Sequence, residues 1–301
     1  MGRDCASSIS IVTLSNFMNK KTLRRWLLGE FSIKRLVRSV FFIYAFFCVY
    51  VFSIADSKIF LPPPASYQDN REILKLTSGD LLGAGKGSPI QISAVYLLHP
   101  KATYTILFAH GNAEDLGNIQ PVLQKLYSLG FSVFAYDYRG YGTSQGSPSE
   151  GNAYRDIDTA YNYLTQTLRI PPKRIIVYGR SVGGGSAVDL AGREAVGGLI
   201  MESSFTSAFR VIVPFPILPF DKFSNIDKIN RVKCPVLVIH GKADDTIPFS
   251  HGEKLFAAAP QPKRYLWVDG AGHNDVMWVA QVEYDKSLRE FTGLVEGLKS
   301  K

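Results

Sequence analysis

The chain has 301 residues, of which 46% are apolar and 20% charged, with 26 glycines and 16 prolines. These proportions are ordinary for a globular protein and exclude a disordered, collagen-like or coiled-coil chain. The net charge of +8 is concentrated at the N-terminus, where residues 1–38 hold eight Lys and Arg against two Asp and Glu. The remaining residues carry only +2, so we expect no nucleic-acid partner.

The cysteines and histidines show no spacing typical of a crosslinked or metal-binding protein. Cys5, Cys48 and Cys234 are too few for a disulfide framework and share no metal-ligand spacing. The five histidines include no pair of the HExxH kind. We therefore expect neither a metal nor a cofactor.

Residues 39–55 form a stretch of 17 residues without charge, rich in Phe, Tyr, Val and Ile. This length is at the lower limit for a membrane-spanning helix, but Leu36 and Val37 can extend it while Arg38 reaches back to the polar surface. A cleaved signal peptide and a buried core helix are the alternatives. The basic segment of 38 residues in front of the stretch is long for a signal peptide. We therefore predict a membrane anchor.

The basic residues before this stretch predict its orientation. Positive charge is enriched on the cytoplasmic side of membrane-spanning segments. We therefore expect a single-pass protein with residues 1–38 in the cytoplasm and everything after residue 56 on the extracytoplasmic side. The Pro-rich residues 56–70 are expected to be a stiff linker.

From residue 71 onward, short apolar runs alternate with helical patterns. The runs of strand length are 73–76, 92–97, 105–109, 132–136, 175–178, 198–201, 235–239 and 265–268. The helical patterns are 118–129, 152–168, 182–191, 250–258 and 276–298. Val- and Ile-rich strands with crossover helices predict one α/β domain over residues 71–301, with a mostly parallel sheet covered on both faces.

Two segments depart from this alternation. The Gly-rich residues 79–89 are expected to be the turn of a hairpin between the first two strands, because the glycine spacing does not fit a phosphate-binding loop. Residues 209–227 are rich in Pro, Phe and Ile without clear periodicity. We interpret them as a short lid over a pocket.

Ser181 has the sequence context of a catalytic nucleophile. It lies in Gly179-Arg-Ser-Val-Gly183, between the predicted strand 175–178 and the predicted helix 182–191. In a nucleophile elbow, a strained strand-to-helix turn exposes the serine, and the flanking glycines let strand and helix approach closely. The adjacent helix N-terminus favours negative charge.

A serine nucleophile needs a base, and the base needs an orienting carboxylate. His273 is the predicted base, because it lies in a Gly-flanked loop directly after the last strand, whereas His240 is expected to support loop structure and His251 to lie on the surface. Asp244, in the loop after strand 235–239, is the predicted acid. Asp245 is then a solvated neighbour, and Glu202 is the rival carboxylate.

The oxyanion that forms on a tetrahedral intermediate requires two converging N–H donors. One is predicted to be the amide of Val182, directly after the nucleophile. The other is predicted to be the amide of Asn112, because Gly111 lets the loop after strand 105–109 turn its amides inward. His110 is expected to be structural. The order Ser, Asp, His is the order found in α/β-hydrolases.

Three further motifs carry a family resemblance. They are Phe108-Ala-His-Gly-Asn-Ala-Glu-Asp-Leu116, Tyr136-Asp-Tyr-Arg-Gly-Tyr-Gly-Thr-Ser144 and Cys234-Pro-Val-Leu-Val-Ile-His-Gly241. Over residues 59–295 the chain resembles the α/β-hydrolase superfamily, and within it the bud-emergence-type proteins, which include membrane-anchored hydrolases and protein depalmitoylases. The resemblance implies a serine hydrolase of esters or thioesters that needs no cofactor.

The sequence therefore predicts a membrane-anchored serine hydrolase that cleaves carboxylic esters through an acyl-enzyme. The expected substrate is a small acyl ester, a lipid or an acylated protein. A thioesterase acting on S-acylated (palmitoylated) proteins is the alternative activity, and a peptidase ranks third. A non-catalytic hydrolase-fold protein that only binds a ligand is the alternative from another class.

Overall fold

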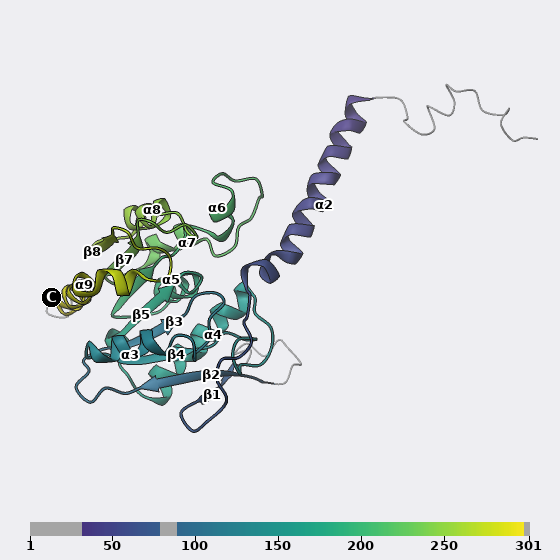
Figure 1. Ribbon diagram of the computed structural model, residues 1–301. Coiled ribbons are helices and arrows are strands. Elements are labelled where there is room, and N and C mark those ends of the chain that lie inside the picture. Colours follow the sequence, from purple (N-terminus) through teal and green to yellow (C-terminus); the bar gives the residue numbers. More distant parts are fainter. Residues whose placement is uncertain (1–31, 79–88, 298–301) are drawn as a thin grey trace, which may run out of the picture. The chain divides into compact units, whose positions relative to one another are not determined.

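The computed structural model describes residues 32–78 and 89–297, and its centre is an eight-stranded sheet (Figure 1). The strands are β1 Leu74–Ser78, β2 Ile90–Leu97, β3 Thr105–Ala109, β4 Ser132–Tyr136, β5 Ile175–Arg180, β6 Gly198–Glu202, β7 Val236–Gly241 and β8 Lys263–Val268. Their order in the sheet is β1-β2-β4-β3-β5-β6-β7-β8. β2 is antiparallel to β1 and β4, and the other neighbours are parallel. The predicted mostly parallel sheet is confirmed.

Helices cover both faces of the sheet. They include α3 Gln120–Ser128, α4 Glu150–Asn162, α5 Gly183–Arg193, α8 Ser250–Ala258 and α9 Val276–Gly297, and two short helices, α6 Ala208–Ile212 and α7 Asn225–Lys228, lie in the connection after β6. Successive side chains of a strand point to opposite faces, so Leu107 and Ala109 of β3 pack in the core beneath α4 and α5. Ile106 and Phe108 pack in the core beneath α3 and α9. The apolar runs of the sequence are thus buried on both sides.

The elements differ from their predicted bounds mainly at the ends. Strand 105–109, strand 132–136 and helix 250–258 have the predicted limits. The predicted helix 152–168 instead ends as α4 at Asn162 and continues as a π-helical turn, Tyr163–Thr167. The pairing of β1 with β2 confirms the hairpin, whereas its turn, at 79–88, lies outside the described residues.

The charge-free stretch lies within helix α2, Ile33–Ile59, which is longer than the 17 residues predicted from the sequence. An 18-residue window of this helix has a mean hydropathy of 2.0, so the helix is long and apolar enough to cross a membrane. The chain divides into two compact units after Val51, inside this helix. Residues 52–59 therefore belong to the same unit as the sheet. In that unit, Ala55 and the following Phe60 are buried.

Candidate active site

Ser181 lies between the end of β5 and the start of α5, with a φ of +53°. This is the left-handed region, which non-glycine residues rarely occupy and which is common at strained functional turns. The Ser181 amide donates to the carbonyl of Glu202 on β6 at 2.9 Å, which holds the turn in place. A Cβ on Gly183 would lie 2.1 Å from the Ala109 carbonyl oxygen of β3, so only glycine permits this approach of helix to strand.

His273 and Asp244 meet Ser181 although they come from different loops. The Nε2 atom of His273 lies 3.0 Å from the Oγ atom of Ser181, and its Nδ1 atom lies 2.8 Å from the Oδ2 atom of Asp244. A carboxylate beside Nδ1 favours the tautomer with the proton on Nδ1, which leaves Nε2 free to accept the serine proton. The structure therefore brings the predicted nucleophile, base and acid together.

Hydrogen bonds around Asp244 keep its carboxylate ionised. Burial alone would raise the pKa of Asp244, but hydrogen bonds from His240 and His273 and from the Ile247 amide outweigh it and hold the pKa well below its usual range. His240 Nε2 also lies 2.9 Å from the Ile247 carbonyl oxygen. This contact confirms the expectation that His240 supports the loop. The neighbouring Asp245 is exposed.

Glu202, the rival carboxylate, takes part in a different network. Its side chain is buried and accepts a hydrogen bond from the Tyr178 hydroxyl, which in turn lies 2.6 Å from the Tyr284 hydroxyl. Burial raises the pKa of Glu202, although the Arg180 guanidinium and the Tyr178 hydrogen bond oppose this. The carboxylate that contacts the His273 ring is that of Asp244.

The loop after β3, residues 110–117, lies against Ser181 and will be called the oxyanion loop. A Cβ on Gly111 would lie 3.5 Å from the Ser181 Cβ, so this loop passes directly beside Ser181. Glu114 in the loop forms an ion pair with the buried guanidinium of Arg180, the residue before Ser181. His110 is fully buried, with Nε2 3.2 Å from the Oδ1 atom of Asp137, as expected of a structural histidine.

A cleft of about 440 Å³ opens in front of these groups. Ser181, His273, Asn112 and Val182 all line it, so the two predicted oxyanion donors lie in the same cleft as the predicted nucleophile and base. Much of the remaining wall is apolar. It is formed by Ile59, Phe205, Ala208, Val211, Ile212 and Ile247. An acyl chain fits such a wall better than a charged group does.

The predicted lid contributes only part of this wall. Of its apolar side chains, Val211 and Ile212 line the cleft, Phe215 is exposed, and Phe223 is buried in the core. These differences depend on where each residue lies on α6 and in the loop after it. The run of Pro, Phe and Ile in the sequence does not distinguish them.

Two features of the site were missed or misjudged from the sequence. Lys58 and Ile59, at the end of α2, line the cleft, although the sequence places them between the anchor and the domain. His251 was expected on the surface but is buried, with its Nδ1 accepting from the Thr206 amide at 3.1 Å. The prediction for His251 is wrong because α8 packs its first turn against the loop after β6.

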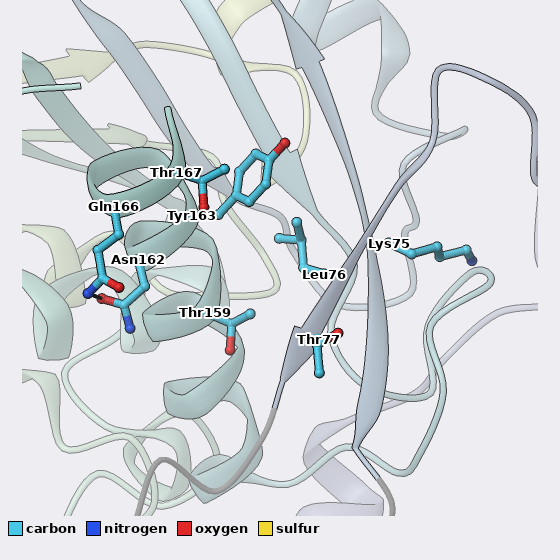
Figure 2. Close-up of a pocket in the computed structure, with 8 residues that line it drawn as sticks. All are labelled: Lys75, Leu76, Thr77, Thr159, Asn162, Tyr163, Gln166 and Thr167. Atoms are coloured by element: carbon cyan, nitrogen blue, oxygen red, sulfur yellow. Dashed lines mark hydrogen bonds between the residues drawn. The ribbon is translucent and has the colours of Figure 1, made fainter. Parts of the chain in front are cut away.

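A second pocket, of about 290 Å³, lies between β1 and the π-helical turn that follows α4 (Figure 2). Its eight lining residues include Thr159, Asn162 and Gln166 but no His, Cys, Asp or Glu. Figure 2 shows the Lys75 side chain pointing away from the helix, and its Nζ atom pairs instead with Asp69 at 2.7 Å. This pocket therefore has no nucleophile–base pair. Among residues 32–78 and 89–297, no cluster of three or more potential metal ligands occurs.

Comparison with known proteins places the chain within one fold. A family model described as serine aminopeptidase, S33 matches residues 100–216, and one described as prolyl oligopeptidase family matches residues 218–292. An esterase from Pyrococcus furiosus superposes with a TM-score of 0.62 at 20% identity, covering 77% of this chain and 98% of that one. A monoacylglycerol lipase from Paleococcus ferrophilus superposes with a TM-score of 0.53 at 19% identity, covering 68% and 98%. These likenesses show the α/β-hydrolase fold.

Curated relatives are much more similar in sequence. Alpha/beta hydrolase domain-containing protein 17B from Xenopus laevis is 46% identical over 195 residues, which cover 64% of this chain and 67% of the relative. The human 17B protein is 45% identical over the same coverage. The protein aho-3 from Caenorhabditis elegans is 46% identical over 198 residues, covering 64% of this chain and 58% of that protein. The resemblance inferred from the motifs is confirmed: the chain is a hydrolase and belongs to the family of the alpha/beta hydrolase domain-containing 17 proteins.

Proposed function

We propose that the protein is a membrane-anchored serine hydrolase that cleaves carboxylic esters through Ser181, His273 and Asp244. The observation that carries the proposal is the continuous contact from Ser181 Oγ to His273 Nε2, at 3.0 Å, and from His273 Nδ1 to Asp244 Oδ2, at 2.8 Å. This arrangement faces an apolar cleft. A nucleophile, a base and an orienting carboxylate in this order are what acyl transfer requires.

The reaction proceeds in two acyl transfers. Ser181 Oγ attacks the carbonyl carbon while His273 Nε2 takes its proton, and the amides of Asn112 and Val182 stabilise the oxyanion. The protonated His273 then gives its proton to the departing alcohol, which leaves an ester on Ser181. Water, deprotonated by His273, attacks this ester, and His273 then returns the proton to Ser181 Oγ as the carboxylic acid leaves. Asp244 holds the imidazole and stabilises its positive charge in both halves.

A thioester fits the same chemistry, with a thiol as the leaving group. The resemblance to protein depalmitoylases favours this alternative, in which the substrate is an S-acylated protein. The apolar wall of the cleft accommodates an acyl chain in either case. Only the leaving group and the preferred chain length separate the two activities.

The experiment is a rate comparison on matched substrates. The full chain in detergent is assayed on p-nitrophenyl esters and on acyl thioesters of equal chain length, with Ser181→Ala as the control. We expect wild-type turnover of esters and a loss of about four to six orders of magnitude in the variant, because triad members act as a unit. Retention of more than about a tenth of the activity in Ser181→Ala would exclude Ser181 from the mechanism. A clear preference for thioesters would select the alternative.

The anchor is proposed from α2, which has the length and hydropathy to cross a membrane. The basic residues that precede it are expected to keep the N-terminus in the cytoplasm, which places the hydrolase domain on the opposite side. Protease added from outside to spheroplasts should therefore degrade the domain. Full protection of the domain, with resistance to carbonate extraction, would mean the opposite orientation. Release by carbonate would mean that there is no anchor.

A further inference from the structure

The segment that follows α2 lies along the oxyanion loop. Its backbone is fixed first by Asn112, the residue proposed to donate an oxyanion amide. The Nδ2 atom of Asn112 donates to the Ile59 carbonyl at 2.7 Å, and its Oδ1 atom accepts from the Leu61 amide at 2.9 Å. The Tyr141 hydroxyl donates to the same Oδ1 at 2.6 Å and accepts from the Leu61 amide at 3.0 Å. One side chain thus joins the two segments.

Further along, the same segment contacts the loop again. The Ser66 amide donates to Asp115 Oδ2 at 2.6 Å, and the Ser66 hydroxyl donates to the other carboxylate oxygen. The fit is close, because a Cβ on Gly117 would lie 2.2 Å from the Ser66 Oγ. The Tyr67 hydroxyl donates at 2.6 Å to Asp137, whose other oxygen accepts from an amide of the loop, that of Leu116, at 3.0 Å.

Packing keeps this segment in place between the hydrogen bonds. The Phe60 side chain is buried, and its ring lies 5.8 Å from that of Phe223 and 6.4 Å from that of Tyr141, centroid to centroid. Its neighbour Ile59 lines the cleft. The segment is therefore a built part of the domain and of the cleft wall.

We propose that residues 59–67 form a strap that holds the oxyanion loop in the conformation required for catalysis. The Asn112 side chain is its principal positioning group. The proposal rests on the proposed function, since it assigns the strap a role in presenting the Asn112 amide to the oxyanion. A displacement of about 1 Å in such a group costs about 100-fold in rate. The strap thus makes the residues directly after the apolar helix part of the catalytic apparatus.

The main test removes the Asn112 side chain but keeps its amide. In the full chain, Asn112→Ala should lower kcat on p-nitrophenyl butyrate by about 10- to 100-fold while changing KM less than about threefold. The matched control is Asn70→Ala, because the Asn70 side chain accepts from the nearby Glu72 amide at 2.8 Å and the residue lies beyond the strap. It should behave as wild type. A kcat for Asn112→Ala within about twofold of wild type would overturn the proposal.

A second variant tests whether the effect passes through Asn112. Tyr141→Phe keeps the packing of a fully buried ring but removes the hydroxyl shared by Asn112 and Leu61. We expect an intermediate loss in kcat, and in the double variant with Asn112→Ala a loss smaller than the product of the single losses. If the loss in kcat of the double variant equals the product of the two single losses, the two side chains act independently, which would contradict a shared strap. This variant also serves if Asn112→Ala does not fold.

Hydrogen exchange tests the strap without any substrate. Amides of residues 110–117 should exchange faster in Asn112→Ala than in wild type, with no change in Asn70→Ala. Unchanged exchange would overturn the proposal. Equal ester hydrolysis by wild type and Ser181→Ala would instead overturn the proposed function, and exchange alone would then decide whether the strap holds the loop.

Discussion

Asp244 shows how the site selects one carboxylate from two neighbours. Its Oδ2 atom lies 2.8 Å from His273, and its Oδ1 atom accepts from the amides of Thr246 and Ile247. Asp245, one residue later, is exposed. The turn of the loop, held by these two amides, therefore decides which carboxylate meets the histidine.

Replacing the acid should be far more costly than replacing its neighbour. Asp244→Asn preserves the shape of the side chain but favours the wrong imidazole tautomer, so we expect a loss of about 10⁴ in kcat. Asp245→Asn is the matched control and should lose less than about tenfold. Steady-state kinetics on one ester measure both variants.

The same assay addresses the rival acid. Glu202→Gln should also lose less than about tenfold, because Glu202 bonds to Tyr178 and supports the turn through its main chain. If Glu202→Gln were the inactive variant and Asp244→Asn the active one, the assignment of the acid would be wrong.

His251 should make the folded state sensitive to acid. Burial, and then the nearby Lys254 and His240, lower the pKa of His251, although Asp244 opposes this. The unfolded chain therefore binds a proton at a higher pH than the folded chain does. The contribution of His251 to the free energy of unfolding is therefore complete above the ordinary histidine pKa of about 6.5. It is lost as the pH falls toward the lower pKa that His251 has in the folded chain.

His251→Asn should remove this part of the pH dependence. The asparagine oxygen can accept from the Thr206 amide, as the His251 Nδ1 atom does at 3.1 Å, but does not titrate. The midpoint of urea unfolding should thus fall less between about pH 7.5 and about pH 5.5 in the variant than in wild type. Parallel losses in the two proteins would show that His251 does not contribute.

At the scale of elements, the approach of α5 to β3 depends on one glycine. A Cβ on Gly183 would collide with backbone, which cannot rotate away as a side chain can. Gly192 lies in the same helix, but its Cβ would meet Arg231 and Lys228 atoms only at 3.7 Å. The two positions therefore offer a matched pair.

Gly183→Ala should destabilise the domain by roughly 3 kcal/mol or more, because it overpacks the contact between helix and strand. Gly192→Ala should be neutral or should stabilise by up to about 1 kcal/mol, because alanine is the better helix former. Thermal unfolding of the two variants measures the difference. A similar Tm for both would mean that the helix can shift without cost.

The local pattern of the sequence predicts elements better than contacts between them. β3, β4 and α8 have their predicted limits, because continuous apolar runs and helical spacing are properties of neighbouring residues. The burial of His251 depends on a loop 45 residues away, and the strap depends on hydrogen bonds from Asn112, 51 and 53 residues away. Such contacts follow from the folded sheet, and the local pattern does not contain them.

In the candidate site, too, the residues placed by local pattern were predictable and those placed by distant contacts were not. Ser181, Asp244 and His273 each directly follow a strand or lie in the loop after one, and the loops at one edge of a parallel sheet converge. The convergence was therefore predictable from residue type and position. Lys58 and Ile59 were not, because nothing in the Pro-rich sequence indicates that the chain turns back to the cleft.

For the whole molecule, the size of the cleft determines the expected substrate. Its volume is about 440 Å³, and Val211 and Ile212, from the segment predicted to be a lid, form part of its wall. Each buried CH₂ contributes roughly 0.8 kcal/mol until the apolar wall is filled. An acyl chain longer than the cleft gains nothing further.

We therefore expect kcat/KM on p-nitrophenyl esters to rise from acetate by about fourfold per CH₂ and to peak at short-to-medium chains. Initial rates across a series of chain lengths measure this. A peak at C16 or longer would contradict the short cleft and favour the depalmitoylase alternative. Cleavage of peptides without cleavage of esters would contradict both.

The central claim, a serine hydrolase acting through Ser181, is tested most directly by mapping a fluorophosphonate adduct by mass spectrometry. The probe forms a covalent bond only with a serine that a base has activated. The account predicts one adduct, on Ser181, and none on any serine of the Ser181→Ala variant. An adduct on another serine, such as the buried Ser203 or Ser204 that directly follow β6, or no adduct in a folded protein under conditions that label a control serine hydrolase, would contradict it.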